Sequence, residues 1–124
     1  MDADLSHDPK EINNFINNLN DYPFVIGSRY IEGGKCEMTG LRLFLSYFGN
    51  KFIKFILKSK CSEFTTSYRG FNLKKLKNFN LNIVENVGYS FFMCVVFELE
   101  RENFDIKEIP ITFYERSSGI SKIP

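Results

Sequence analysis

Two carboxylates stand one residue apart at the start of the chain, where Asp2 and Asp4 flank Ala3. In an extended segment, residues two apart point to the same side. We therefore expect both carboxylates to face one point, where a hard divalent cation such as Mg²⁺ or Mn²⁺ would find oxygen ligands. The alternative is that the pair belongs to a turn at a strand end and carries only solvated charge. On spacing alone, this second interpretation is the commoner one.

The residues after the acidic pair predict the element that positions it. Asp8 can cap a helix, Pro9 suits the first helical position, and Glu11 can close a capping box. The apolar residues that follow are spaced i, i+3, i+4 and i+7, which predicts an amphipathic helix as far as about Asn20.

Further along the chain, the hydrophobic pattern predicts a mixture of helices and strands. Residues 24–26 read as a short buried strand. Residues 91–101 read as a buried helix, with a strand as the alternative because of their β-branched pair. Residues 106–114 read as a strand in which Pro110 favours an edge position. Residues 35–40 look irregular, and residues 73–76 predict one or two helical turns. The sequence therefore predicts an α/β domain.

The segment from Leu41 to about Lys58 predicts a helix of unusual composition. Its apolar and aromatic residues are interrupted by the cations Arg42, Lys51 and Lys54. Such a mixture suits a helix at a bilayer interface, where basic side chains reach towards headgroups. The alternative is a core helix with a basic face in solvent.

Composition limits the classes of protein to which the chain can belong. Its 124 residues support a single domain over residues 1–124. A formal net charge of +1 does not indicate a nucleic-acid partner. The cysteines Cys36, Cys61 and Cys94 form no C-x-x-C pair, so we expect apolar roles in a reducing compartment. The acidic start does not predict a signal peptide, and no apolar stretch of about 18 residues predicts a membrane span.

Short motifs, in order along the chain, resemble the polyprenol-phosphate sugar transferases, and especially the dolichol-phosphate mannose synthase-like members of the family 2 glycosyltransferases. The motifs are DADLSHDP (2–9), VIGSRYIEGG (25–34), RLFLSYFGN (42–50), TSYRGF (66–71), GYSF (88–91) and IPITFYERSSGISK (109–122). The resemblance implies part of a nucleotide-diphospho-sugar transferase fold of the GT-A type. In that family a nucleotide-binding half precedes the Asp-x-Asp motif. The resemblance therefore implies a partial domain that lacks this N-terminal half.

The resemblance also implies roles for individual residues. A metal ion held by Asp2, Asp4 and Ser6 would neutralise the leaving nucleotide diphosphate, with Asp4 as the catalytic residue. His7 is a neighbouring alternative to Ser6. The residues that match the family's lipid-phosphate arginines are Arg29, Arg42 and Arg116. Further candidates for substrate contact are Arg69, Tyr89, Ser90 and Lys122.

The activity that follows from the resemblance is transfer of mannose, or a related hexose, from GDP-mannose to dolichyl or polyprenyl phosphate, with inversion. We expect it at the cytoplasmic face of a membrane, with a separate chain supplying the nucleotide-binding half. The alternative is a truncated, inactive remnant that acts as a membrane-surface or protein-binding module. This alternative draws on the positions of Tyr47, Phe92 and Cys94, where relatives carry polar residues.

Overall fold

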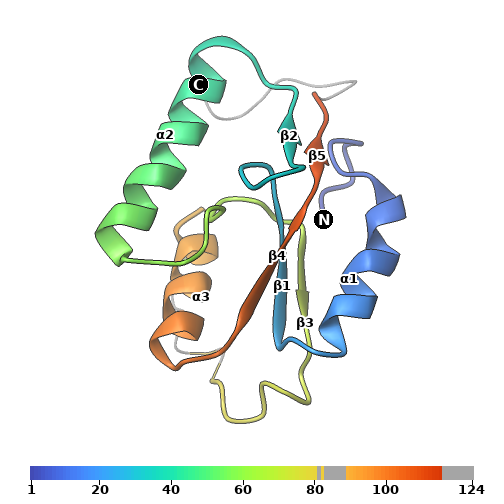
Figure 1. The fold of residues 1–124 in the computed structure, drawn as a ribbon, viewed down its shortest axis with the longest axis vertical. Coiled ribbons are helices and arrows are strands. Elements are labelled where there is room, and N and C mark those ends of the chain that lie inside the picture. Colours follow the sequence, from blue (N-terminus) through green and yellow to red (C-terminus); the bar gives the residue numbers. More distant parts are fainter. Residues whose placement is uncertain (81, 83–88, 116–124) are drawn as a thin grey trace.

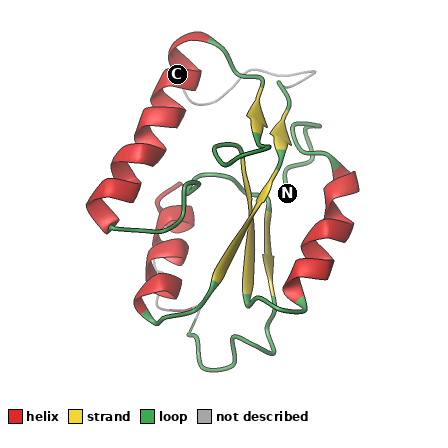
Figure 2. Cartoon of the chain, in the orientation of Figure 1, coloured by secondary structure: helices red, strands yellow, loops and turns green. Residues whose placement is uncertain are grey.

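The computed structural model describes residues 1–80, 82 and 89–115, and it shows a mixed α/β fold with helices on both faces of a small sheet (Figures 1 and 2). The sheet has three strands in the order β3-β1-β4. The helices are η1 (Pro9–Glu11), α1 (Ile12–Leu19), α2 (Gly40–Leu57) and α3 (Tyr89–Arg101). The strands are β1 (Phe24–Ser28), β2 (Lys35–Cys36), β3 (Arg69–Phe71), β4 (Ile106–Pro110) and β5 (Thr112–Phe113).

The central strand β1 is buried along its whole length, as its apolar sequence predicts. Because successive side chains alternate between faces, Phe24 and Ile26 pack on the side of α3, whereas Val25 packs with Phe15 of α1. Gly27 lies on the same side as Val25. A Cβ atom there would lie 2.9 Å from the Ile111 side chain, so only glycine leaves room for Ile111 at this position.

The directions in which the strands pair determine which strand ends lie next to each other. β1 runs antiparallel to β3 and parallel to β4, with Ser28 opposite Pro110 at the end of the second ladder. Ile111 then connects two sheets, because its N–H donates to Ser28 O (3.0 Å) while its carbonyl accepts from Lys35 N–H (2.9 Å). Beyond it, β5 pairs in parallel with β2. The predicted strand at 106–114 is thus confirmed, although it divides between two sheets.

The beginning of the chain differs from the prediction in one respect. Asp8 caps η1 by accepting from Lys10 N–H (2.9 Å), and Pro9 is the first residue of η1, as predicted. The preceding residues, however, form bends and no strand. Leu5 adopts a left-handed conformation with φ of 66°, which turns the chain between the carboxylates and the helix. The extended geometry expected around Asp2 and Asp4 is therefore absent.

Smaller expectations have mixed outcomes. Residues 73–78 form turns, and Leu76 N–H donates to Asn72 O (3.1 Å), so one helical turn is present as predicted. Residues 35–40 are less irregular than predicted, because β2 starts at Lys35. The predicted helix at 91–101 is confirmed as α3, whose Val95, Val96 and Leu99 are fully buried.

Helix α2 attaches to the body through a polar seam, which we define as Ser46, Asn50 and Lys54. These residues are four apart and so lie on one face. Asn50 accepts from Phe64 N–H (2.8 Å), and Lys54 donates to the Ser62 hydroxyl (3.1 Å). The C-terminal half adds apolar contacts through Ile53 and Leu57, and in the first half the Tyr47 ring meets Tyr30 edge-on.

The opposite face of α2 is apolar and exposed to solvent. We call this the apolar face of α2, and it comprises Leu41, Phe44, Leu45, Phe48, Phe52, Phe55 and Ile56. Phe55 is 81% exposed, the largest exposed fraction among them. A surface helix of a water-soluble domain normally has the reverse arrangement, with apolar residues inward. Within the described part of the chain, no helix combines the length and apolarity needed to cross a bilayer.

Candidate functional site

The two carboxylates lie in a short acidic segment, residues 1–8, whose geometry is set by Ser6. The Ser6 side chain is fully buried, and both its N–H (3.1 Å) and its hydroxyl (2.5 Å) donate to Asp4 Oδ1. Ser6 therefore orients Asp4 in this structure, and its role as a metal ligand beside Asp4 stays a prediction. Asp2 is exposed and Asp4 is partly buried. Both carboxylates thus lie at the surface end of a segment that is anchored from within.

His7 provides the second anchor of the acidic segment. Its ring stacks on Tyr68 (centroids 4.9 Å apart) and meets Phe113 edge-on (5.7 Å). Nδ1 accepts from Asp2 N–H (3.2 Å), which requires an unprotonated Nδ1. Burial is the main cause that lowers the pKa of His7 below 6.5, so the ring is neutral near pH 7. Since Nδ1 already holds the Asp2 backbone, His7 positions the acidic segment, and its role as an alternative ligand stays a prediction.

Residues next to β3 and β5 complete the attachment of the acidic segment. Tyr68 donates its hydroxyl to Asp8 O (2.7 Å), and Tyr114 N–H donates to Ser6 O (2.9 Å). The amino group of Met1 donates to Ser67 O (2.9 Å). The segment is therefore fixed to the residues just before β3 and just after β5, two parts of the chain far from it in sequence.

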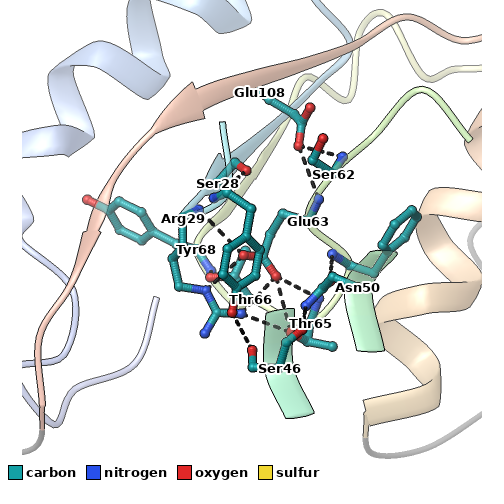
Figure 3. Close-up of polar contacts among 12 residues, drawn as sticks. Ser28, Arg29, Ser46, Asn50, Ser62, Glu63, Thr65, Thr66, Tyr68 and Glu108 are labelled. Atoms are coloured by element: carbon teal, nitrogen blue, oxygen red, sulfur yellow. Dashed lines mark hydrogen bonds and ion pairs between the residues drawn. The ribbon is translucent and has the colours of Figure 1, made fainter. Parts of the chain in front are cut away.

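Arg29 directly follows β1 and forms a buried ion pair with Glu63 (Figure 3). Nε donates to Glu63 Oε2 (2.8 Å), while Nη2 donates to Glu63 Oε1 (2.9 Å) and to the hydroxyl of Thr65 (3.0 Å). Burial opposes the charged form of Arg29, but the hydrogen bonds and charge of Glu63 raise its pKa above the ordinary value. Two of the three guanidinium nitrogens are thus occupied by protein groups. Arg29 was predicted to bind lipid phosphate. With Nε and Nη2 engaged by Glu63 and Thr65, Nη1 is the guanidinium nitrogen that would make this contact.

A groove of about 450 Å³ opens beside Arg29, between the end of β1, β2 and the first half of α2. Its walls are largely aromatic and apolar, and Arg29 and Lys35 supply cations. The lining residues are Arg29, Tyr30, Gly34, Lys35, Cys36, Gly40, Leu43, Phe44, Tyr47 and Phe48. Tyr30 and Ser46 of the polar seam share a short hydrogen bond between their hydroxyls, which fixes α2 against the groove. Arg42 is exposed on α2, one turn before Ser46.

Phe113 joins the acidic segment to the groove. Its ring is the edge-on partner of His7, and the Arg29 guanidinium carbon lies 5.3 Å from its centroid. His7, the predicted alternative ligand in the acidic segment, and Arg29, one predicted phosphate arginine, therefore contact the same aromatic side chain. Arg116 lies outside the described residues, so the predicted trio of arginines is described only for Arg29 and Arg42.

Arg69 is engaged within the protein. Its guanidinium donates to the backbone carbonyls of Thr66 (2.7 Å), Phe64 (2.8 Å) and Phe92 (2.8 Å), and it lies over the Phe92 ring. Burial lowers the pKa of Arg69 to about 10, which leaves it protonated at neutral pH. The structure thus gives Arg69 a structural role, and its contact with substrate stays a prediction.

The remaining candidates for substrate contact lie at the start of α3 or outside the described residues. Tyr89 and Ser90 are the first two residues of α3, and Ser90 is exposed. Lys122 lies in the undescribed tail. Sequence reasoning gave no role to Glu63, although it is fully buried and holds Arg29. A lone acid in a segment of small and aromatic residues was the available signal, because a buried carboxylate needs a cationic partner.

The carboxylate oxygens of the acidic segment fit a hard cation that takes only a few of its ligands from the protein. Among the described residues, no three His, Cys, Asp or Glu side chains gather as a metal site. Mg²⁺ is commonly held by one or two carboxylates together with substrate phosphates and water. Asp2 and Asp4, at the surface end of an anchored loop, match that pattern and would leave most coordination positions to the substrate.

Comparison with known proteins gives relatives across nearly the whole chain. It is 34% identical over 125 aligned residues to polyprenol monophosphomannose synthase from Mycolicibacterium smegmatis, with 99% of this chain and 47% of that protein covered. It is 33% identical over 124 aligned residues to undecaprenyl-phosphate mannosyltransferase from Micrococcus luteus, with 99% and 51% covered. The chain therefore spans about half the length of the curated relatives it matches. No protein-family model matches the sequence.

Proposed function

The chain is homologous to about half of each of these polyprenyl-phosphate mannosyltransferases, and from this premise we propose that it forms the acceptor side of such an enzyme. The reaction is transfer of mannose, or a related hexose, from GDP-mannose to a polyprenyl phosphate. The fold is the acceptor-side part of a GT-A domain. The observation that carries the proposal is that Phe113 joins the acidic segment to Arg29 and its groove.

The donor side of the reaction depends on Asp2 and Asp4. A Mg²⁺ or Mn²⁺ ion bound there would neutralise charge on the departing nucleoside diphosphate. Ser6 supports this role by holding one Asp4 oxygen, which fixes the direction of the carboxylate. His7 supports it by holding the Asp2 backbone. These two residues position the carboxylates without contacting the substrate themselves.

The acceptor side of the reaction is the groove beside Arg29. The Arg29–Glu63 ion pair carries no net charge, so it adds little electrostatic attraction for the phosphate. The contribution of Arg29 would instead be hydrogen bonds from Nη1 to the phosphate oxygens. Lys35 at the groove and Arg42 nearby supply net positive charge for the phosphate. Arg116 is a further candidate from the family pattern. The aromatic walls suit the first isoprene units of the lipid.

The chemical step needs no general base from the protein. A phosphate monoester is already ionised near neutral pH, so it can attack the anomeric carbon directly in one inverting displacement. The protein's contribution is to position the two substrates and to neutralise charge.

The apolar face of α2 supports a location at the membrane surface. Its large side chains are exposed, Lys51 lies on the same helix, and Lys58 directly follows the helix end. Burying such a face among lipid acyl chains while lysines reach the headgroups is favourable for an interfacial helix. We expect binding to anionic vesicles, and we expect the double change Lys51→Glu and Lys58→Glu to weaken it.

The decisive experiment reconstitutes the proposed enzyme. The chain is mixed with the unmatched part of the Mycolicibacterium smegmatis relative, radiolabelled GDP-mannose, polyprenyl phosphate and Mn²⁺. We expect a mannosylated lipid whose formation stops with a chelator and with Asp4→Asn. Asp105→Asn, an exposed acid on the loop before β4, is the matched control and should leave the product unchanged. Absence of product from the reconstituted mixture would favour the inactive remnant.

A further inference from the structure

The loop at residues 62–65 contacts both helix α2 and Arg29 (Figure 3). On the side of Arg29, Glu63 accepts from the guanidinium through both of its carboxylate oxygens. The N–H and the hydroxyl of Thr65 also donate to Glu63 Oε1, at 3.1 Å each. Glu63 is therefore oriented by its own loop as well as by Arg29, and the position of this loop determines where the guanidinium lies.

Two side chains from other elements hold the backbone of this loop. Glu108 of β4 accepts through Oε1 from two successive N–H groups, those of Ser62 (2.9 Å) and Glu63 (3.1 Å). Asn50 of α2 accepts from the next N–H in the loop, that of Phe64 (2.8 Å). Three consecutive backbone amides thus donate to side chains, which replace the strand pairing that holds the backbone within the sheet.

Both of these side chains are themselves fixed in place. Asn50 is buried, and its amide donates to Ser46 O (2.7 Å). Glu108 lies opposite Ile26 in the parallel ladder, and its carboxylate also has a hydrogen bond to the Ser28 side chain. Partial burial raises the pKa of Glu108, although these hydrogen bonds favour its charged form. Since removing a carboxylate from water is unfavourable, its position here indicates a specific role in holding the loop.

We propose that Glu108 and Asn50 are positioning residues for the acceptor phosphate. They hold the 62–65 loop, and through Glu63 they hold the Arg29 guanidinium in the orientation that meets the phosphate. This inference rests on the proposed function, and it adds two residues that do not line the groove. Removing either one should let the loop and the guanidinium move together, so that hydrogen bonds to the phosphate weaken while the groove walls keep their residues.

The side-chain Nε–H of Arg29 reports this coupling without any ligand. It donates to Glu63 Oε2 (2.8 Å), and the Arg29 side chain is 6% exposed, so the proton should exchange slowly with water. The measurement is NMR of the chain in a mild detergent. Glu108→Ala should speed the exchange by roughly fivefold or more, because two loop amides lose their acceptor. Glu108→Gln keeps an acceptor oxygen at the same position, so it should restore most of the slow exchange.

A second variant and a control separate positioning from a general loss of stability. Asn50→Ala removes the other anchor of the loop and should speed the exchange in the same direction, so the test does not depend on one variant folding. Leu19→Ala is the control, because Leu19 packs with Phe15 on one face of the sheet, whereas Phe64 belongs to the cluster on the other face. It should lower the melting temperature and leave the exchange of the Arg29 proton unchanged below the transition.

Titration with a water-soluble ten-carbon prenyl phosphate tests the link to the acceptor. Binding is followed at the same Arg29 signal. Glu108→Ala should weaken binding by roughly five- to tenfold, because the hydrogen bonds from Nη1 are charge-assisted and directional. Glu108→Gln should weaken it by less than about twofold, since the loop keeps its acceptor.

The outcomes distinguish this inference from the proposed function. Equal exchange in Glu108→Ala and Leu19→Ala, or equal exchange in Glu108→Ala and Glu108→Gln, would overturn the positioning role. Faster exchange with unchanged prenyl phosphate affinity would overturn the link to the acceptor. If the unaltered chain bound no prenyl phosphate, the acceptor groove of the proposed function would be wrong, and so would the phosphate part of this inference. The exchange comparison would still decide whether the two residues position Arg29.

Discussion

Replacing Arg69 by methionine should destabilise the chain more than any exposed charge change. The guanidinium donates to three backbone carbonyls at 2.7–2.8 Å, and these bonds tie the loop before β3 to α3. Hydrogen bonds from a charged group contribute about 1.5–3 kcal/mol each, but three made by one group do not add fully, and removing a buried charge returns part of the loss. Methionine retains much of the side-chain packing. We therefore expect the free energy of unfolding to fall by about 3–5 kcal/mol.

Urea unfolding followed by circular dichroism measures this loss. With a slope of about 2 kcal/mol per molar, typical of a small domain, the midpoint should fall by roughly 2 M. A domain whose free energy of unfolding is about 5–15 kcal/mol in total would remain folded in water unless its value lies near the lower end of that range. Arg69→Lys should recover less than half of the loss, because one ammonium group cannot reach three carbonyls in the planar arrangement.

Arg101→Met is the matched control for this prediction. Arg101 pairs with Glu98 at 2.6 Å, but its side chain is 56% exposed, and such pairs contribute about 0–1 kcal/mol. If Arg69→Met changed the free energy of unfolding as little as Arg101→Met does, the three carbonyl contacts would not support the fold as argued.

Three further predictions concern the surroundings of the site. Asn50→Ala should lower the free energy of unfolding by about 1–3 kcal/mol in urea titrations, since it leaves a buried loop N–H without its acceptor. The pKa of His7 lies below 6.5 in the folded chain, so the unfolded chain binds more protons at acidic pH. The free energy of unfolding should therefore keep its full value above pH 6.5 and decrease as the pH falls below it. His7→Gln should remove this part of the pH dependence in urea titrations. Gly34→Ala would place a Cβ 2.5 Å from Ser28 O and should lower the melting temperature, whereas Gly49→Ala, with open space around it, should raise it slightly.

The regular elements were predictable because their signals are local. The spacing of Phe15 and its apolar neighbours predicted α1, the Asp8-Pro9 pair predicted the start of η1 directly before it, and the apolar run at Phe24 predicted β1. The bend at the acidic segment was not predicted, because it depends on Ser6 turning back to Asp4, a choice that a one-residue spacing does not reveal.

The site was predictable in residue type but not in partnership. Arg29 was singled out as an anion-binding residue, yet its partner Glu63 lies 34 positions away with no motif linking them. Only the folded chain shows that the arginine is already engaged. Likewise, the apolar character of 41–58 was visible in the sequence, whereas its polar seam depends on the loop at 62–64 lying against it.

Helix α2 has consequences for handling the protein in water. Hydrogen bonds that involve Tyr30, Asn50 and Lys54 attach the helix to the body, while most of its apolar surface faces solvent. In buffer without detergent, we expect molecules of the chain to aggregate through α2 while the sheet is still folded. A mild detergent should dissociate the aggregates and leave the hydrogen bonds of the fold intact. Solubility and folding are therefore separate properties in this molecule, and a poorly behaved preparation would say little about whether the chain had folded.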